Sequence, residues 1–356
     1  MVQIIKNQPL NFTLPLSLQC ATPSELRGIE RHEVRLMTSF REDNRIEHSL
    51  FKNIGDFLEA GDVLVVNTSG TLKAALPVTL PNGQSGRIHL STHRKDNEWL
   101  VELRSVSDNK THRYHQAKVG DVLNLPEQGS MKIVAPYYRD VASGKKHLQL
   151  WIARFDLPVE MEAFLEKYGT PIRYAQIEEA YPAAYYQTVF ANETGSAEMP
   201  SAGRAFTPDL VTSLMAKGIL FAPILLHTGV ASVETGEQPY PEYFRVSPTS
   251  ASLINWAKSQ GRRIIAVGTT AIRALETVAD PNGKVREGEG WTNLFITPER
   301  GLHVVNGLLT GFHEPKASHL LMLEALAERS HLAVSYQAAI QEGYQWHEFG
   351  DLHLVL

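Results

Sequence analysis

The chain has 356 residues but a single cysteine, Cys20, so it can form no disulfide within itself. Disulfides are typical of secreted proteins, and their exclusion favours a cytoplasmic location. The N-terminus lacks the basic head and apolar block of a secretory signal. No apolar run approaches the roughly 20 residues that a membrane-spanning helix needs. We therefore expect a cytoplasmic protein without membrane contact, in which a lone cysteine more often packs than reacts.

Motifs for common cofactors are missing as well. The sequence contains neither a phosphate-binding P-loop nor a glycine-rich dinucleotide fingerprint. His313 and His319 do not have the spacing of a zinc motif, and a chain with one cysteine is a poor candidate for a structural zinc site. We expect no bound metal.

Basic residues are concentrated in one part of the chain, although the net charge is −5. Residues 72–155 contain 13 Lys and Arg against 7 Asp and Glu, and the remainder is acidic. Such a segment could attract a polyanion. A solvated β surface with scattered basic side chains explains the same pattern, and from charge alone it is the better explanation.

The hydrophobic pattern divides the chain into three parts. Residues 34–66 contain apolar strand-like runs and one short helical run. Between residues 72 and 155 there are only short β-like runs separated by turn clusters, which is typical of a small barrel or sandwich. The helical period returns after residue 156, and strands alternate with helices from Phe206 onward. The sequence thus predicts an α/β domain, residues 1–71 and 156–356, with an inserted all-β barrel domain, residues 72–155.

Two expected helices have clear end signals. "TPDLVTSLMAKG" begins with Thr207 as N-cap and Pro208 at the first helical position, and Gly218 ends it. "SPTSASLINWAKSQG" follows the same plan from Ser247. A shorter helix is expected in "KNIGDFLEAG", up to Gly61.

Candidate binding residues lie where a predicted strand ends and a helix begins, since ligands gather there in parallel β/α folds. In "RIIAVGTTAIRALE" the strand ends at Gly268. The missing side chain there, the hydroxyls of Thr269 and Thr270 and the free N–H groups of the helix could hold a carboxylate, phosphate or ribose. Arg273, one turn later, could pair with an acid. A tight turn with a threonine cap is the alternative.

A second candidate stretch is "LLHTGVASVETGEQPYPEYF". His227 ends a predicted buried strand, where a histidine can act as an acid, a base or a hydrogen-bond donor. A structural histidine is at least as probable. Gly229 follows, and Glu242 and Tyr243 lie in a proline-rich loop that could cover a ligand.

Three further stretches contribute candidates. In "GEGWTNLFITPERG", Trp291 beside Thr292 offers an indole that could stack on a base or fill the core. "NGLLTGFHEP" places Asn306, Thr310 and His313 ahead of a helix. "PSAGRAFTP" has a small-residue turn followed by a cation, formed by Ser201, Ala202, Gly203 and Arg204.

Together and in this order, the motifs resemble those of the S-adenosylmethionine:tRNA ribosyltransferase-isomerase family of queuosine biosynthesis. The resemblance runs from about Arg31 to the C-terminus. It rests on the blocks "GDVLVVNTSGTLKAAL", "PSAGRAFTPDLV", "LLHTGV", "IIAVGTTAIRALE", "GEGWTNLFI", "VVNGLLTGFHEP" and "EGY…FGDLHL". Several blocks in order are far more specific than any one of them.

This resemblance implies a barrel-like α/β domain with a small inserted β-barrel, as the hydrophobic pattern also predicts. It implies that the ribosyl part of S-adenosylmethionine, a co-substrate, moves to the aminomethyl nitrogen of a 7-deazaguanine (preQ1) at the tRNA wobble position. The product is epoxyqueuosine, and adenine and methionine leave. The implied partner is tRNA, bound through the basic inserted domain, and no metal takes part. We expect a monomer.

By the same resemblance, His227 and His313 are candidates for proton transfer, and Asp351 in the C-terminal "GD" for binding a ribose hydroxyl or the amine. The methionine carboxylate or ribose would lie at Gly268–Thr270 and Arg273. The expected substrate-binding residues are Asn67, Ser201, Ala202, Gly203, Arg204, Gly229, Glu242, Tyr243, Gly268, Thr269, Thr270, Arg273, Trp291, Thr292, Asn306 and Thr310.

The chain departs from the family pattern at several positions, which indicates a divergent subgroup. Arg204 and Ala205 stand where the family usually has Leu and His, and Gly311 where it usually has Asn. "NTSGT" replaces a stretch that usually contains Arg. These differences leave open ribosyl transfer to another acceptor, such as a small molecule, and a binding protein without turnover.

Overall fold

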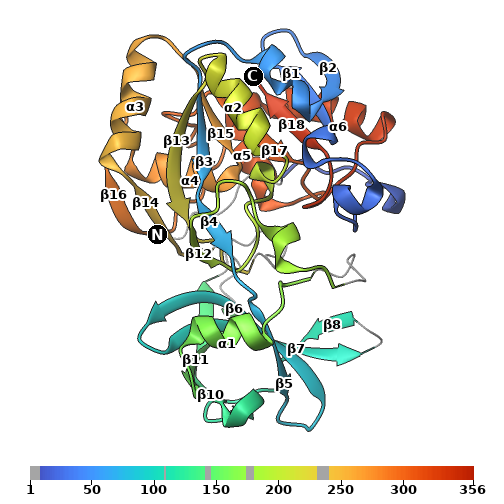
Figure 1. Cartoon of the computed structure of the whole chain (residues 1–356), viewed down its shortest axis with the longest axis vertical. Coiled ribbons are helices and arrows are strands. Elements are labelled where there is room, and N and C mark those ends of the chain that lie inside the picture. Colours follow the sequence, from blue (N-terminus) through green and yellow to red (C-terminus); the bar gives the residue numbers. More distant parts are fainter. Residues whose placement is uncertain (1–8, 108–109, 141–145, 174–179, 231–239) are drawn as a thin grey trace.

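The computed structural model describes residues 9–107, 110–140, 146–173, 180–230 and 240–356, with the backbone alone at residues 110, 138–140 and 146–149. Its strands form a nine-stranded sheet, a seven-stranded sheet and a two-stranded ribbon. Figure 1 shows the large sheet in the upper part of the view and the small sheet below it. Among the described residues, no helix is both long and apolar enough to cross a bilayer.

The large sheet is built from strands of both halves of the chain. Its members are β1 (Arg35–Phe40), β2 (Arg45–Leu50), β3 (Val63–Asn67), β13 (Leu220–Leu226), β14 (Glu242–Val246), β15 (Ile264–Val267), β16 (Gly288–Thr292), β17 (Gly307–Gly311) and β18 (Leu352–Val355). Their order is β16-β14-β13-β3-β15-β17-β18-β1-β2.

Parallel pairing is concentrated in the centre of this sheet. The four strands β13, β3, β15 and β17 are parallel to one another. The sheet is more mixed than the β/α alternation predicts, because β14, β18 and β1 run opposite to these four.

Helices cover both faces of the large sheet. Successive side chains of a strand point to opposite faces, and in β3 Val63 and Val65 point to one core while Leu64 and Val66 point to the other. The first core is formed with α3 (Pro248–Ser259), α4 (Thr269–Val278), α5 (Ser318–Ala327) and α6 (Arg329–Gln341). The second is formed with α2 (Pro208–Ala216) and the 3-10 helix Phe51–Phe57.

The predicted helix caps are confirmed. Thr207 Oγ1 accepts a hydrogen bond from the N–H of Leu210 at 3.3 Å, and Ser247 Oγ accepts one from Ser250 at 3.1 Å. Each such cap is worth about 1 kcal/mol. The run "KNIGDFLEAG" differs from its prediction, since it forms a 3-10 helix that ends at Phe57. Gly55, a poor residue for an α-helix, lies inside it.

The small sheet is antiparallel and nearly closed, as predicted for a small β-barrel. It contains β5 (Ala75–Thr79), β6 (Ser85–Lys95), β7 (Glu98–Ser107), β8 (Lys110–Arg113), β9 (Val122–Asn124), β10 (Ser130–Asp140) and β11 (Lys146–Asp156). The order is β5-β6-β7-β11-β10-β9, with β8 paired to β7, and the two end strands β5 and β9 contact each other. Helix α1 (Met161–Tyr168) adds Phe164 and Leu165 to the core of this sheet. The domain limits at residues 72 and 155 stay a prediction.

The two sheets are joined by contacts at one edge of the large sheet. The parallel ribbon of β4 (Ser69–Thr71) and β12 (Glu193–Ser196) lies between them (Figure 1). Ser91 Oγ of β6 accepts a hydrogen bond from the N–H of Val230 at 3.0 Å. Tyr240 packs on Leu100 and Leu150 of the small sheet. The small sheet is thereby held against the C-terminal ends of the central strands β3, β13, β15 and β17, which form one edge of the large sheet.

Candidate active site

The strand order brings most of the predicted site residues to this one edge of the large sheet. The strands β3, β13, β15 and β17 end there, and β14 and β18 begin there. Residues far apart in sequence meet as a result: Asn67 Nδ2 donates to Thr270 Oγ1 at 3.3 Å. Asn306 precedes β17 at the opposite edge, where its Oδ1 accepts from the N–H of Ile264 at 2.7 Å. The structure does not bring Asn306 to this site.

A cleft of about 960 Å³ lies between this edge and the small sheet. One wall is formed by Glu193, Thr194 and Gly195 of the ribbon strand β12, together with His227, Tyr243 and Trp291 of the large-sheet domain. The facing wall comes from the small sheet and the segment leading into α1, and includes Ser91, Thr92, His93, Arg94, Asp96, Trp99 and residues 157–162. Its size is that of small-molecule binding sites, about 300–1,000 Å³.

His227 lies in the cleft wall with its two ring nitrogens in different surroundings. Nδ1 is 2.8 Å from the hydroxyl of the buried Ser69. Nε2 faces Glu193, 3.7 Å from Oε1, and the side chain is 20% exposed. Gly195 lies so close to the ring that a Cβ there would be 2.4 Å from it. The imidazole therefore occupies space that only a glycine leaves free.

Burial lowers the pKa of His227, and the charge of Glu193 opposes that shift. A histidine with a lowered pKa is neutral at neutral pH. His227 is therefore present in the cleft as an uncharged imidazole, which can donate from one nitrogen and accept at the other.

Aromatic rings continue the same wall. The ring of Tyr243 is stacked on His227, with centroids 5.9 Å apart and an interplanar angle of 24°. Trp291 meets Tyr243 edge-on at 5.8 Å, and 48% of its surface is exposed. An exposed indole can stack on a nucleobase or an adenine.

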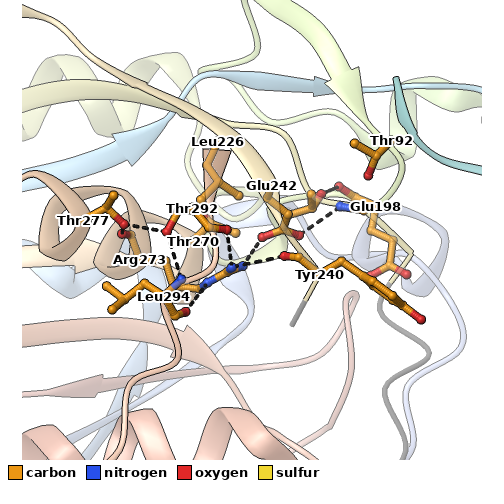
Figure 2. A network of polar contacts seen from close by, with 12 residues as sticks. Thr92, Glu198, Leu226, Tyr240, Glu242, Thr270, Arg273, Thr277, Thr292 and Leu294 are labelled. Atoms are coloured by element: carbon orange, nitrogen blue, oxygen red, sulfur yellow. Dashed lines mark hydrogen bonds and ion pairs between the residues drawn. The ribbon is translucent and has the colours of Figure 1, made fainter. Parts of the chain in front are cut away.

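Behind this wall, Arg273 and Glu242 form a buried ion pair (Figure 2). Arg273 also donates to the backbone carbonyls of Tyr240, Thr292 and Leu294 at 3.2–3.4 Å. Glu242 Oε1 accepts from the N–H of Gly229 at 2.9 Å. The acid that Arg273 pairs with is thus a residue of this chain, and contact of Arg273 and Glu242 with a ligand stays a prediction.

The start of α4 presents polar backbone and threonine groups at the C-terminal end of the central strand β15. Gly268 has φ +89°, a conformation that favours glycine, and no side chain caps the helix. The first N–H groups of an uncapped helix can bind an anion. Asn67 fixes the neighbouring strand ends, since its amide donates to the carbonyl of Leu226 at 2.8 Å and accepts from the N–H of Ser69 at 3.1 Å.

His313 lies after β17 at the same edge. Its Nε2 is 3.0 Å from Thr310 Oγ1, and its ring is stacked on His319 with centroids 5.0 Å apart. Burial lowers the pKa of His313 well below its usual value. Burial and the charge of Arg273 lower the pKa of His319 to about 4. Both rings are therefore neutral at neutral pH.

The remaining predicted residues are held mainly by the protein itself. Asp351 is buried, and its two carboxylate oxygens accept from the N–H groups of Arg35 and Gln345, each at 2.8 Å. Burial raises the pKa of Asp351, against the effect of these two bonds. Arg204 is 3% exposed and donates to Glu25 at 2.6 Å. A ligand contact of Asp351 or Arg204 stays a prediction.

The turn ahead of Arg204 lies close to the start of α4. Residues Ser201–Gly203 form a 3-10 turn that contacts β17. The Cβ of Ala202 is 3.5 Å from the place that a Cβ of Gly268 would take. In the part of the chain that the structure describes, no three His, Cys, Asp or Glu side chains are grouped as metal ligands would be.

Comparison with known proteins matches this chain along nearly its whole length. Residues 7–355 match the family described as queuosine biosynthesis protein. The chain belongs to this family.

Relatives of similar length carry the name S-adenosylmethionine:tRNA ribosyltransferase-isomerase. The protein of Desulfitobacterium hafniense is 36% identical over 99% of this chain and 100% of its own length. That of Staphylococcus haemolyticus is 32% identical over 98% and 99%. A crystal structure of the S-adenosylmethionine tRNA ribosyltransferase from Thermotoga maritima matches with a TM-score of 0.53 and 27% identity, covering 98% of this chain and 99% of that one.

Three of the positions at which this queuosine-family chain is predicted to depart from the family pattern lie together. Arg204, Ala205 and Gly311 all line one small cavity, of about 10 Å³, next to Glu348. Room of this size holds about one water molecule. These three differences therefore fall in one small part of the structure, whereas "NTSGT" lies outside that cavity, at β3 and β4.

Sequence reasoning did not single out the residues that surround His227. Ser69, Glu193, Gly195 and Ser196 come from β4 and β12, which are short and have no strong hydrophobic period. Their pairing alone brings them to the histidine. The cleft wall on the small sheet, including Trp99, was likewise not anticipated.

Proposed function

We propose that the protein is an S-adenosylmethionine:tRNA ribosyltransferase-isomerase that acts on preQ1 in the tRNA anticodon. It would transfer the ribosyl moiety of S-adenosylmethionine to the aminomethyl group of preQ1 and release adenine and methionine, with epoxyqueuosine as the product. Because the acceptor is tRNA, the proposal places the protein in the cytoplasm. The observation that carries it is the family match over residues 7–355.

The edge of the large sheet supports a division of the binding site into two parts. The uncapped start of α4 suits a carboxylate, so the methionine end of the co-substrate would lie at Gly268–Thr270. The cleft beside His227 and Trp291 would take a base. His313, neutral and stacked on His319, would serve as a second hydrogen-bonding or proton-transferring group.

The tRNA itself would lie along the cleft and the small sheet. Three arginines of this sheet already have acidic partners: Arg104 and Arg113 pair with Glu102, and Arg154 pairs with Glu98. Arg94 lines the cleft. We therefore place the phosphate contacts near the cleft rim rather than over the whole basic segment.

Incubation of the protein with S-adenosylmethionine and a preQ1-containing anticodon stem-loop tests the proposal. We expect stoichiometric release of adenine and a matching mass gain on the RNA. The same RNA with guanine at the wobble position is the control and should release none. Absence of adenine release with the preQ1 RNA contradicts the proposal. Adenine release that a small amine supports without RNA would contradict the tRNA assignment.

A further inference from the structure

A chain of four polar groups runs behind His227, away from the cleft. The N–H of Thr228 donates to Ser196 Oγ at 3.0 Å. Ser196 Oγ is 2.6 Å from Ser69 Oγ, and Ser69 Oγ is 2.8 Å from His227 Nδ1. Ser196 and Ser69 are 0% and 1% exposed, so water does not complete their bonding. The direction of the hydrogens in this chain decides which nitrogen of His227 carries its proton.

One end of this series of hydrogen bonds is fixed, because the backbone N–H of Thr228 can only donate. Ser196 Oγ accepts this hydrogen, and within the described residues the one acceptor in reach of its own hydrogen is Ser69 Oγ. Ser69 then accepts from Ser196 and donates its hydrogen to His227 Nδ1. In this arrangement every hydrogen of the chain is used, and Nδ1 is an acceptor.

The opposite arrangement leaves two groups badly placed. If Nδ1 carried the proton, Ser69 would accept from His227 and donate to Ser196, and the hydrogen of Ser196 would have no partner. A buried donor without an acceptor carries its full desolvation penalty. The lone pair of Nε2 would also face the carboxylate of Glu193 at 3.7 Å. Both effects favour a proton on Nε2.

We propose that Ser69 and Ser196 are positioning residues that hold the neutral His227 with its proton on Nε2, so that it acts in the cleft as a hydrogen-bond donor and not as a base. Nδ1 is occupied from behind, and Gly195 and Tyr243 confine the ring. Nε2–H, which has Glu193 Oε1 at 3.7 Å beyond hydrogen-bond distance, is then the ring donor left for a ligand in the cleft. The donor role rests on the proposed function, in which the donor would stabilise electron density that builds up on a reacting or departing group. A neutral imidazole can supply such a bond without charge.

The tautomer can be measured without any substrate. In the full chain with 15N-labelled histidine, long-range 1H–15N correlation spectra of His227, assigned from a His227→Gln sample, should show Nε2 as the protonated nitrogen and Nδ1 as the unprotonated one at pH 7.5. Ser69→Ala should give a mixture of both tautomers. Ser39→Ala is the matched control, because Ser39 is also a buried serine between histidine rings but lies elsewhere, and it should leave the His227 signals unchanged. A proton on Nδ1 in the wild type overturns the proposal.

Two substitutions of His227 separate a donor from a base. The amide of His227→Gln offers an N–H near the position of Nε2 but cannot take up a proton, whereas His227→Ala offers neither. Loss of one donor of this kind lowers turnover about 10²- to 10³-fold. We expect this loss in His227→Ala and at most about a tenfold loss in His227→Gln.

Equal, severe losses in the two variants would indicate a base, and unchanged turnover in His227→Ala would leave His227 without a role; either result overturns the inference. Ser69→Ala should lower turnover roughly two- to tenfold, in proportion to the remaining Nε2–H population, with little change in KM. If the wild type releases no adenine with the preQ1 RNA, the proposed function fails. The tautomer measurement still decides the hydrogen-bond chain in that case.

Discussion

Polar side chains buried inside the large-sheet domain bond to one another, whereas those that face the cleft keep part of their surface free. Behind the edge, Arg273 pairs with Glu242, and Ser39 bridges His331 and His353 at 2.9 and 2.7 Å. These groups are buried and bonded to one another. In the cleft wall, His227 and Trp291 keep an atom or a ring face open.

Serine and histidine therefore have two different roles in this protein, one structural and one at the cleft. A serine between two histidines at Ser39 joins strands and helices, whereas Ser69 orients a histidine toward a cleft. Changes behind the edge should therefore lower stability, and changes in the cleft wall should lower binding or turnover.

Breaking the buried ion pair should have the largest effect. Glu242→Ala leaves the Arg273 guanidinium buried without its partner, and such a loss costs about 3–5 kcal/mol of unfolding free energy. Urea denaturation followed by circular dichroism measures it. Glu289→Ala, at an exposed acid on β16, is the control and should stay within about 0.5 kcal/mol of wild type. A loss below about 1 kcal/mol in Glu242→Ala would show that the pair has little structural importance.

Removing the exposed indole should weaken RNA binding without affecting stability. Stacking of one base on an aromatic side chain is worth about 1–3 kcal/mol, so Trp291→Ala should raise the Kd for the anticodon stem-loop about 5- to 150-fold. Trp256→Ala is the matched control, because Trp256 is 53% exposed but lies on α3 outside the cleft. Equal Kd values for the two variants would contradict a stacking role for Trp291.

The buried histidines should make the fold sensitive to acid. Burial, with the charge of His331, lowers the pKa of His353 to about 3. His353 takes up a proton near pH 6.5 in the unfolded chain but only near pH 3 in the folded one. As the pH is lowered from 6.5 to 3, the free energy of unfolding therefore decreases by about 1.4 kcal/mol per pH unit.

The comparison of wild type with His353→Gln isolates this contribution. Glu348 acts in the opposite direction, since burial raises its pKa to about 8 and its stabilising protonation is lost as pH rises from 4.5 through 8. The wild type should lose stability relative to His353→Gln as pH falls from 6.5 to 5. A difference that does not change with pH would show that His353 is not held neutral.

The smallest effect is expected at the cleft rim. If Arg94 contacts one phosphate, Arg94→Ala should make the association constant for the stem-loop less dependent on salt. The slope of its logarithm against the logarithm of salt concentration should decrease in magnitude by about 0.7. Arg154→Ala, which removes an arginine already paired with Glu98, is the control and should change the slope less. An unchanged slope in Arg94→Ala would place the phosphate contacts elsewhere.

Local signals in the sequence predicted a large part of the fold. The caps at Thr207 and Ser247 and the apolar run of β3 act over a few residues, so they can be recognised without tertiary information. The change to short β runs after residue 72 likewise indicated the small sheet. The 3-10 helix at Phe51–Phe57 differs because its packing against α2, at Gly55 and Leu214, is a tertiary contact.

The candidate site was predictable only where strand ends mark it. His227 and Gly268 follow apolar runs, and both lie at the edge. Asn306 was grouped with Thr310 because the sequence does not show that β17 separates them. The partners of His227, namely Ser69, Ser196 and Glu193, could not be predicted, since the register of β4 on β12 brings them together.

Turnover and stability of His227→Ala, measured on the same preparation, decide whether the cleft wall serves the reaction and not the stability of the fold. Adenine release with the preQ1 stem-loop should fall about 10²- to 10³-fold. The unfolding free energy should stay within about 1 kcal/mol of wild type, because the ring is partly exposed in the cleft wall. Unchanged adenine release, or a loss of activity that only follows unfolding, would contradict the distinction between the cleft wall and the buried clusters.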